Sequence, residues 1–186
     1  MSKDPHPFLL GDKIYLRPLE LKELREGPYL CWLNDPEVTK FLETGFFPTT
    51  HADLEQFYRN VVKSPENIML AIVDRKTDQH IGNVKLGSIS WLHRFAEFGI
   101  MIGDKSFWGH SYGTEVTQLT LQYGFMKLNL NKITLVVHAS HESAIRLYRK
   151  LGFKIEGTLR SQFFCDGAYT DKYLMGILRD EFVCDQ

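Results

Sequence analysis

Three consecutive stretches decide the fold: Phe95-Ala-Glu-Phe-Gly-Ile-Met-Ile102, then Gly103-Asp-Lys-Ser-Phe107, then Trp108-Gly-His-Ser-Tyr-Gly-Thr-Glu115. The first predicts a strand, the second a turn, and the third a glycine-bearing loop that leads into a helix. The core face of this helix is expected at Val116, Leu119, Tyr123 and Met126. A loop that opens a helix presents free backbone N–H groups at the positive end of the helix dipole, where a phosphate can bind. Such a loop by itself is more often an ordinary turn with a cap.

The composition is that of an ordinary globular protein. The 186 residues include 44% hydrophobic and 24% charged side chains, which predicts one domain spanning residues 1–186. The 22 basic and 23 acidic residues are well mixed, so neither a nucleic acid nor an anionic membrane is expected as a partner. Three widely spaced cysteines predict no disulfide framework and no metal site. No apolar run is long enough to span a membrane, and the expected location is cytoplasmic.

Hydrophobic periodicity predicts a single α/β domain. The expected helices, after a polar helical turn within 18–27, cover residues 28–34, 50–61, 112–126 and 140–151. The expected strands cover residues 14–17, 68–73, 80–90, 95–102, 133–137, 153–164 and 168–178. The three strands between residues 68 and 102 are expected to form an antiparallel meander.

Three motifs in this order and spacing resemble the GNAT acyl-CoA N-acyltransferases. The segment Trp108 to Gly113 is similar to the family's Gln/Arg-x-x-Gly-x-Gly/Ala loop. Ala144 to Phe153 matches the family's fourth helix, and Gly157-Thr-Leu-Arg160, with Asp166, Gly167 and Asp171, resembles the ending of one branch. That branch includes the enzymes that acetylate ribosomal-protein N-termini and several small-amine acetyltransferases. The resemblance extends from Lys13 to about Phe182.

The resemblance implies a GNAT fold and acetyl-CoA as the cofactor. In this fold a mixed, mostly antiparallel sheet of about seven strands is splayed between strands 4 and 5 and flanked by about four helices. The implied cofactor-binding residues are Ile100, Met101 and Ile102 on the fourth strand, Trp108, Gly109, His110, Ser111, Tyr112, Gly113 and Thr114 in the loop, and His141, Ala144 and Tyr148 on the fourth helix. A homodimer is implied only by likeness to the family.

Three of these positions depart from the family pattern. Trp108 replaces Gln or Arg, Ser111 replaces the middle glycine, and His141 replaces an asparagine that bonds the pantetheine arm. If position 111 requires a positive φ, serine is strained there by ~1 kcal/mol or more. These departures keep open a non-catalytic acyl-CoA-binding role as an alternative to an enzyme.

Acetyl transfer to an amine requires a base for the amine, polarisation of the thioester carbonyl, and a proton for the leaving thiolate. By resemblance, a backbone N–H at a bulge at Ile100, Met101 or Ile102 polarises the carbonyl, and Tyr148 is the acid. From the sequence alone, Tyr148 could equally be core. Glu97 is a charged residue on an otherwise apolar strand and is the first candidate for the base. The alternatives to this role are a solvated edge position or a partner in an ion pair. His138, at the end of a strand, is the alternative base.

The acceptor is expected to be a primary amine, acetylated directly in a ternary complex. The candidate acceptor residues are Trp32, Phe46, Glu97, Arg160, Phe163 and Tyr169, each of which could also be ordinary core or rim. The segment Trp32 to Val38 resembles family members that acetylate nucleotide-linked amino sugars, which favours a small molecule such as an amino sugar. The absence of an acidic run disfavours a polyamine. A peptide N-terminus is the alternative acceptor.

Overall fold

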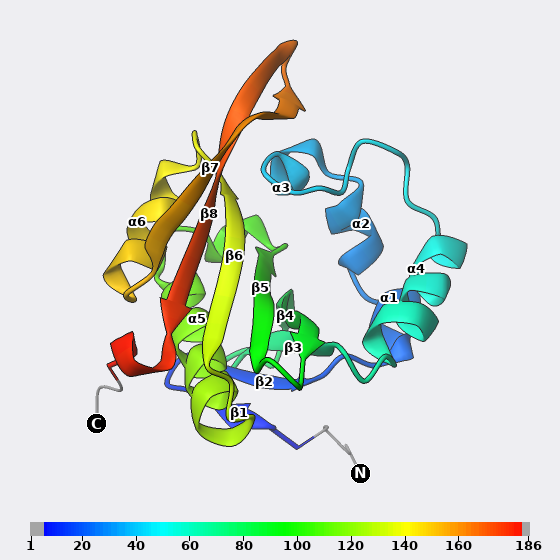
Figure 1. The fold of residues 1–186 in the computed structure, drawn as a ribbon. Coiled ribbons are helices and arrows are strands. Elements are labelled where there is room, and N and C mark those ends of the chain that lie inside the picture. The colour runs from blue at the N-terminus through cyan, green and yellow to red at the C-terminus, as the bar shows by residue number, and fades with distance from the viewer. Residues whose placement is uncertain (1–5, 184–186) are drawn as a thin grey trace.

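The computed structural model describes residues 6–183 and is built on one mixed sheet of eight strands (Figure 1). The strands are β1 (Leu9–Leu10), β2 (Ile14–Pro18), β3 (Ile68–Asp74), β4 (His80–Ser90), β5 (Phe95–Ile102), β6 (Lys132–His138), β7 (Lys154–Cys165) and β8 (Ala168–Leu178). Their spatial order is β1-β2-β3-β4-β5-β6-β8-β7, and only the β5–β6 pair is parallel. The predicted α/β fold and the antiparallel meander of β3, β4 and β5 are confirmed.

Six α-helices and four short helical segments connect the strands. The α-helices are α1 (Leu21–Glu26), α2 (Tyr29–Leu33), α3 (Pro36–Thr39), α4 (His51–Phe57), α5 (Tyr112–Gln122) and α6 (Glu142–Lys150). π-helical segments extend α4 (Tyr58–Val62) and α5 (Tyr123–Lys127), and 3-10 turns lie at Lys105–Phe107 and Arg179–Glu181. Among residues 6–183, no helix has the length and apolar character needed to cross a membrane.

Each face of the sheet carries its own core. On one face, β-strand residues such as Ile72, Phe98 and Ile133 pack against α5 and α6. On the other, Tyr15, Ala71 and Val73 pack against α1, α2 and α4. Figure 1 shows the same division, with α5 and α6 on one side of the strands and α1, α2 and α4 on the other. Successive strand residues alternate between these faces, so a side chain's position in a strand tells which side it reaches.

The sheet is splayed between β5 and β6. These strands pair only from Phe95–Lys132 to Glu97–Thr134, although β5 continues to Ile102 and β6 to His138. The backbone of β5 beyond Glu97 is therefore paired with β4 alone. This is the splay that the resemblance implied, because the fourth and fifth expected strands are β5 and β6.

Four features differ from the sequence-based expectations. Residues 6–183 form six α-helices instead of about four, because short helices such as α3 (Pro36–Thr39) lie outside the expected ranges. The sheet has eight strands instead of about seven, since Leu9 and Leu10 pair with β2. Met126 is 48% exposed and Phe125 is buried in its place, because the π-helical segment widens the last turn and shifts the helix phase. The register against β4 is regular from Glu97 to Ile102, and the irregularity lies at Gly87–Ser90 of β4.

Candidate functional site

The splay places two sets of residues on opposite sides of the sheet. Phe98 belongs to the core under α5 and α6, whereas Met101 packs against the core under α1, α2 and α4. By strand alternation, Ile100 and Ile102 share the face of Phe98, and Glu97 shares the face of Met101. A group that lies between β5 and β6 can therefore be approached from both faces. Because β5 has no bulge at residues 100–102, any free N–H there results from the splay.

The loop between β5 and α5 carries two left-handed residues, separated by His110. Gly109 has φ +77° and Ser111 has φ +66°, and Ser111 is the N-cap of α5 without a side-chain capping bond. The first N–H groups of an α-helix have no partner within the helix. The loop thus presents the N–H groups of Tyr112, Gly113 and Thr114 next to an exposed serine hydroxyl. These donors suit a phosphate.

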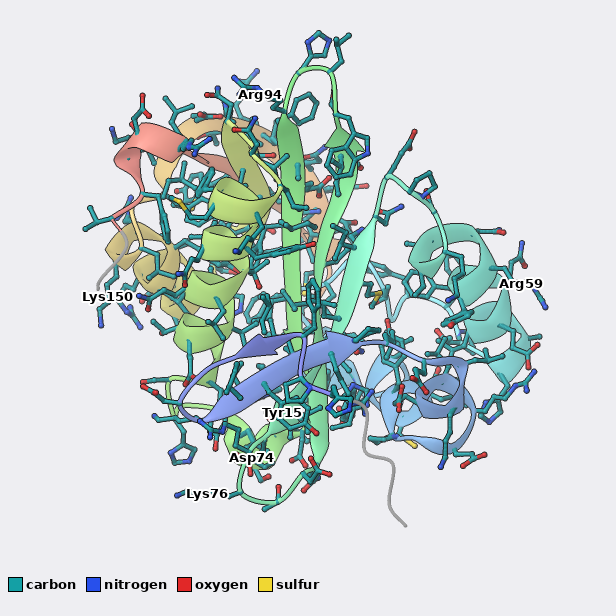
Figure 2. All side chains as sticks on the ribbon, turned by 90° about the horizontal axis from the view of Figure 1, so that it is seen from below. Tyr15, Arg59, Asp74, Lys76, Arg94 and Lys150 are labelled. Atoms are coloured by element: carbon teal, nitrogen blue, oxygen red, sulfur yellow. The ribbon has the colours of Figure 1, made fainter. Side chains whose placement is uncertain are left out.

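Hydrogen bonds fix this loop to the sheet. The Trp108 indole N–H donates to the Ile102 carbonyl at 2.8 Å. Trp108, one of the three departures from the family pattern, thus anchors the loop to the end of β5. Lys13 donates to the His110 carbonyl at 3.0 Å, and the Tyr112 hydroxyl donates to Asp74 at 2.8 Å. Figure 2 shows Asp74 at the end of β3, beside the turn that carries Lys76.

Tyr148 reaches the splay from α6. Its ring meets the Phe98 ring edge-on, with centroids 6.2 Å apart, and the residue is 9% exposed. Burial raises the pKa of the hydroxyl to about 12. Among residues 6–183, no hydrogen bond joins this hydroxyl to another group. Tyr148 is thus both a core residue, as one interpretation expected, and a protonated phenol without a partner next to β5.

His141 and Ala144 lie at the start of the same helix. His141 is the N-cap residue of α6, and its ring stacks on Phe41 at 4.1 Å. Its Nδ1 is 3.3 Å from the Ser143 hydroxyl. Burial and the neighbouring His138 lower the pKa of this imidazole, which favours the neutral form. Ala144 is half-buried one turn before Tyr148.

Glu97 lies at the vertex of the splay. It is the last residue of β5 that pairs with β6, and it is exposed. Glu97 therefore has a solvated position and is not enclosed by its apolar neighbours, because its face of the sheet is open at this row. Its position next to the unpaired part of β5 keeps it within the candidate site.

His138 belongs to a cluster that the sequence did not predict. It is 3% exposed, with the Phe163 ring edge-on at 3.8 Å and Phe41 at 5.6 Å. Its Cα partner on β8 is Lys172, which is 6% exposed and lies 4.6 Å over the Phe163 ring. Glu43 forms an ion pair with Lys172. The signal in the sequence was a lysine inside a strand that is otherwise largely apolar.

The six candidate acceptor residues are not all brought together. Phe46 packs on Phe163 at 5.6 Å and borders a hollow of about 330 Å³ formed by residues 43–49 and Asp53. Trp32 is 7% exposed and packs on His80. Arg160 and Tyr169 are exposed on the β7–β8 hairpin, where Tyr169 packs on Phe164. Since Phe163 and Phe164 alternate along β7, Tyr169 lies on the face opposite Phe163.

Known proteins resemble this chain over nearly its full length. The Acetyltransferase (GNAT) domain family matches residues 13–154. The spermidine N(1)-acetyltransferase of Escherichia coli is 32% identical over 180 residues, covering 92% of this chain and 89% of the relative. An uncharacterised N-acetyltransferase, p20 of Bacillus licheniformis, is 31% identical over 177 residues, covering 94% of this chain and 97% of the relative.

The fold agrees with these matches. The crystal structure of the spermidine N-acetyltransferase from Vibrio cholerae, in complex with CoA and spermine, superposes with a TM-score of 0.83. Its sequence is 30% identical, and the match covers 91% of this chain and 97% of that one. Family, fold and splayed sheet agree, and the chain belongs to the GNAT family of acetyl-CoA-dependent N-acetyltransferases.

Proposed function

We propose that this enzyme transfers an acetyl group from acetyl-CoA directly to a primary amine of a small molecule, in a ternary complex. The observation that carries the proposal is the placement of Glu97 and Tyr148. They reach the β5–β6 splay from opposite faces of the sheet, Glu97 from the side of α1–α4 and Tyr148 from the side of α5 and α6. A base and an acid are thus available on the two sides of one reacting centre.

The two residues have separate roles. The Glu97 carboxylate takes the proton of the attacking amine, directly or through water, because it is exposed at the vertex. Tyr148 gives its proton to the leaving thiolate, since its pKa of about 12 keeps the phenol protonated at neutral pH. His138 remains the alternative base, because burial lowers the pKa of its imidazole and its buried Nε2 has no partner among residues 6–183.

The residues along the splay fit acetyl-CoA, which supplies the activated acetyl group when bound. The loop from Trp108 to Thr114 would hold the pyrophosphate on its N–H groups, and the Ser111 hydroxyl adds one donor. Backbone groups of Ile100, Met101 and Ile102 that point away from β4 would bond the pantetheine arm and the carbonyl. His141 and Ala144 line the same path from α6.

The acceptor is argued from the aromatic wall and from the relatives. Phe46 and Phe163 lie together and suit the face of a sugar or a nucleobase, which favours an amino sugar. A polyamine is the second candidate, because two of the relatives described above are spermidine acetyltransferases. The comparisons favour neither a peptide N-terminus, as in the ribosomal-protein branch, nor a non-catalytic role. The cytoplasmic location, the single domain and the homodimer remain predictions.

The test is thiol release from acetyl-CoA with three acceptor sets side by side: nucleotide-linked amino sugars, spermidine with spermine, and short peptides with ribosomal-protein N-termini. We expect release with a small amine and not with the peptides. Release with spermidine alone would move the acceptor to the polyamines. Release with the peptides alone would contradict the proposal, and no release with any amine would remove the catalytic assignment.

A further inference from the structure

The buried lysine of β8 is paired in an asymmetric way. The Lys172 side chain is 7% exposed, whereas the side chain of its partner Glu43 is 76% exposed. The lysine is part of the sheet, and the glutamate reaches it from the loop between α3 and α4. Burial lowers the pKa of Lys172, and a carboxylate in contact acts in the opposite direction. The ammonium at this position therefore requires an anion beside it.

His138 supplies a second polar group at the same place. Both His138 and Lys172 contact the ring of Phe163, and they are opposite one another on β6 and β8. The Nδ1 of His138 lies 3.3 Å from the Ser140 hydroxyl, and its buried Nε2 has no partner among residues 6–183. If the serine donates to Nδ1, Nε2 carries the proton and is a donor.

We propose that Lys172 and His138 form the binding site for an anionic group of the acceptor, and that the Glu43 carboxylate marks where this group binds. The Glu43 side chain is exposed and comes from a loop, so a ligand anion can take its place while the buried ammonium stays paired. The assignment gives His138 a binding role in place of the base role.

The spacing limits which acceptors fit. Glu97 is opposite Thr134, and His138 follows four positions later on β6 (134 to 138), a distance of ~13 Å at ~3.3 Å per residue. The Lys172 side chain closes part of this distance. The site therefore fits a primary amine with a phosphate or carboxylate several bonds away, such as a nucleotide-linked amino sugar, and disfavours a polycation.

This inference rests on the proposed function, and matched acceptors test it separately. The first pair is a nucleoside-diphosphate-linked amino sugar and the same amino sugar without phosphate. The second pair is an ω-amino carboxylate and its amide. Spermidine is the cationic reference. In at least one pair, we expect kcat/KM of the anionic member to exceed that of its uncharged partner by about tenfold or more, which is the effect of a charge-assisted hydrogen bond. A preference within the first pair alone identifies phosphate, and one within the second pair alone identifies carboxylate.

Variants of the ion pair complete the test. Lys172→Met should abolish the preference for the anionic acceptor by raising its KM, whereas Lys172→Arg should retain the preference. Glu43→Ala, at an exposed residue, should lower KM for the anionic member several-fold. Lys154→Met, which removes the exposed pair with Glu181, is the control and should change nothing. If Lys172→Met does not fold, the other two variants decide. Equal rates within both pairs, or a preference unchanged by these substitutions, would overturn the inference while leaving the acetyltransferase assignment intact.

Discussion

A single phenol carries the proposed acid chemistry, and its surroundings explain how. Tyr148 packs between Phe98 and Phe153, with centroids at 6.2 Å and 5.6 Å, so its ring is fixed while its hydroxyl has no partner within residues 6–183. A hydroxyl that bonds nothing in the protein contributes little to stability. Core packing and catalysis therefore use different ends of the same side chain.

Tyr148→Phe should lower kcat about 100-fold and leave CoA affinity within about threefold, because the ring remains and only the proton donor is lost. Steady-state thiol release and calorimetric titration of CoA measure the two effects. Tyr123→Phe, a half-buried tyrosine outside the site, is the matched control and should retain full activity. Unchanged turnover in Tyr148→Phe would remove the acid assignment.

Two buried imidazoles predict how stability depends on pH. Burial lowers the pKa values of His80 and His138, so the folded protein binds fewer protons than the unfolded chain as the pH falls. Their contribution to stability is complete above the unfolded pKa of about 6.5 and is lost as the pH falls through it toward the lowered values.

Urea unfolding at about pH 7.5 and pH 5 should show lower stability at the acid value, and His80→Gln should reduce this difference. The exposed His93→Gln is the control and should leave the difference as it is. An equal pH dependence in His80→Gln and the parent would show that His80 does not contribute.

The loop that opens α5 combines strain with hydrogen-bond donors. Ser111 is left-handed at φ +66°, a conformation that costs a residue with a Cβ ~1 kcal/mol or more. Gly109, two residues earlier, is also left-handed at no such cost. Strain of this kind is retained where the surrounding structure fixes the backbone, and here Trp108 and Tyr112 anchor the loop on both sides.

Ser111→Gly should stabilise the protein by ~0.5 kcal/mol net, since relief of strain exceeds the added entropy of the unfolded chain. Ser111→Ala keeps the strain and removes the hydroxyl, so we expect CoA binding to weaken about 3- to 10-fold. Ser88→Gly, at φ +50° on β4, should give a similar gain in stability without any change in CoA affinity. Equal CoA affinity in Ser111→Ala would exclude a phosphate bond from the hydroxyl.

At the scale of the whole molecule, α2 packs closely against the end of β5. Gly103 follows β5 directly, and a Cβ at this residue would overlap the buried indole of Trp32. The same indole packs on His80 at 5.0 Å. This contact holds the helices of one face against the splayed end of the sheet, which explains why Trp32 is core and not an open pocket wall.

Gly103→Ala should destabilise the protein by about 1–3 kcal/mol or more, because neither the indole nor the backbone can move without breaking core contacts. Chemical denaturation measures the change. Gly157→Ala, whose Cβ would meet nothing within 4 Å, is the control and should cost far less. A small effect at Gly103 would mean that α2 moves freely against β5.

The sequence by itself determined the α/β class, the order of the main strands and the family, because these depend on periodicity and on motifs local in the chain. The capping box of Thr50 and Asp53 and the left-handed Gly152 are signals of the same local kind, since each lies next to the helix end that it marks. The Met126 prediction was wrong because a π-helical turn has no clear signature in side-chain spacing.

Only the tertiary structure decided which side chains meet at the splay. Glu43 and Lys172 are 129 positions apart in the chain and become partners because the loop after α3 folds against β8. Residues such as Phe163 and Tyr169 look equivalent in the sequence, but strand alternation and hairpin register place them on opposite faces. The site depends on long-range pairing, and local patterns carry no information on which distant segments will pack together.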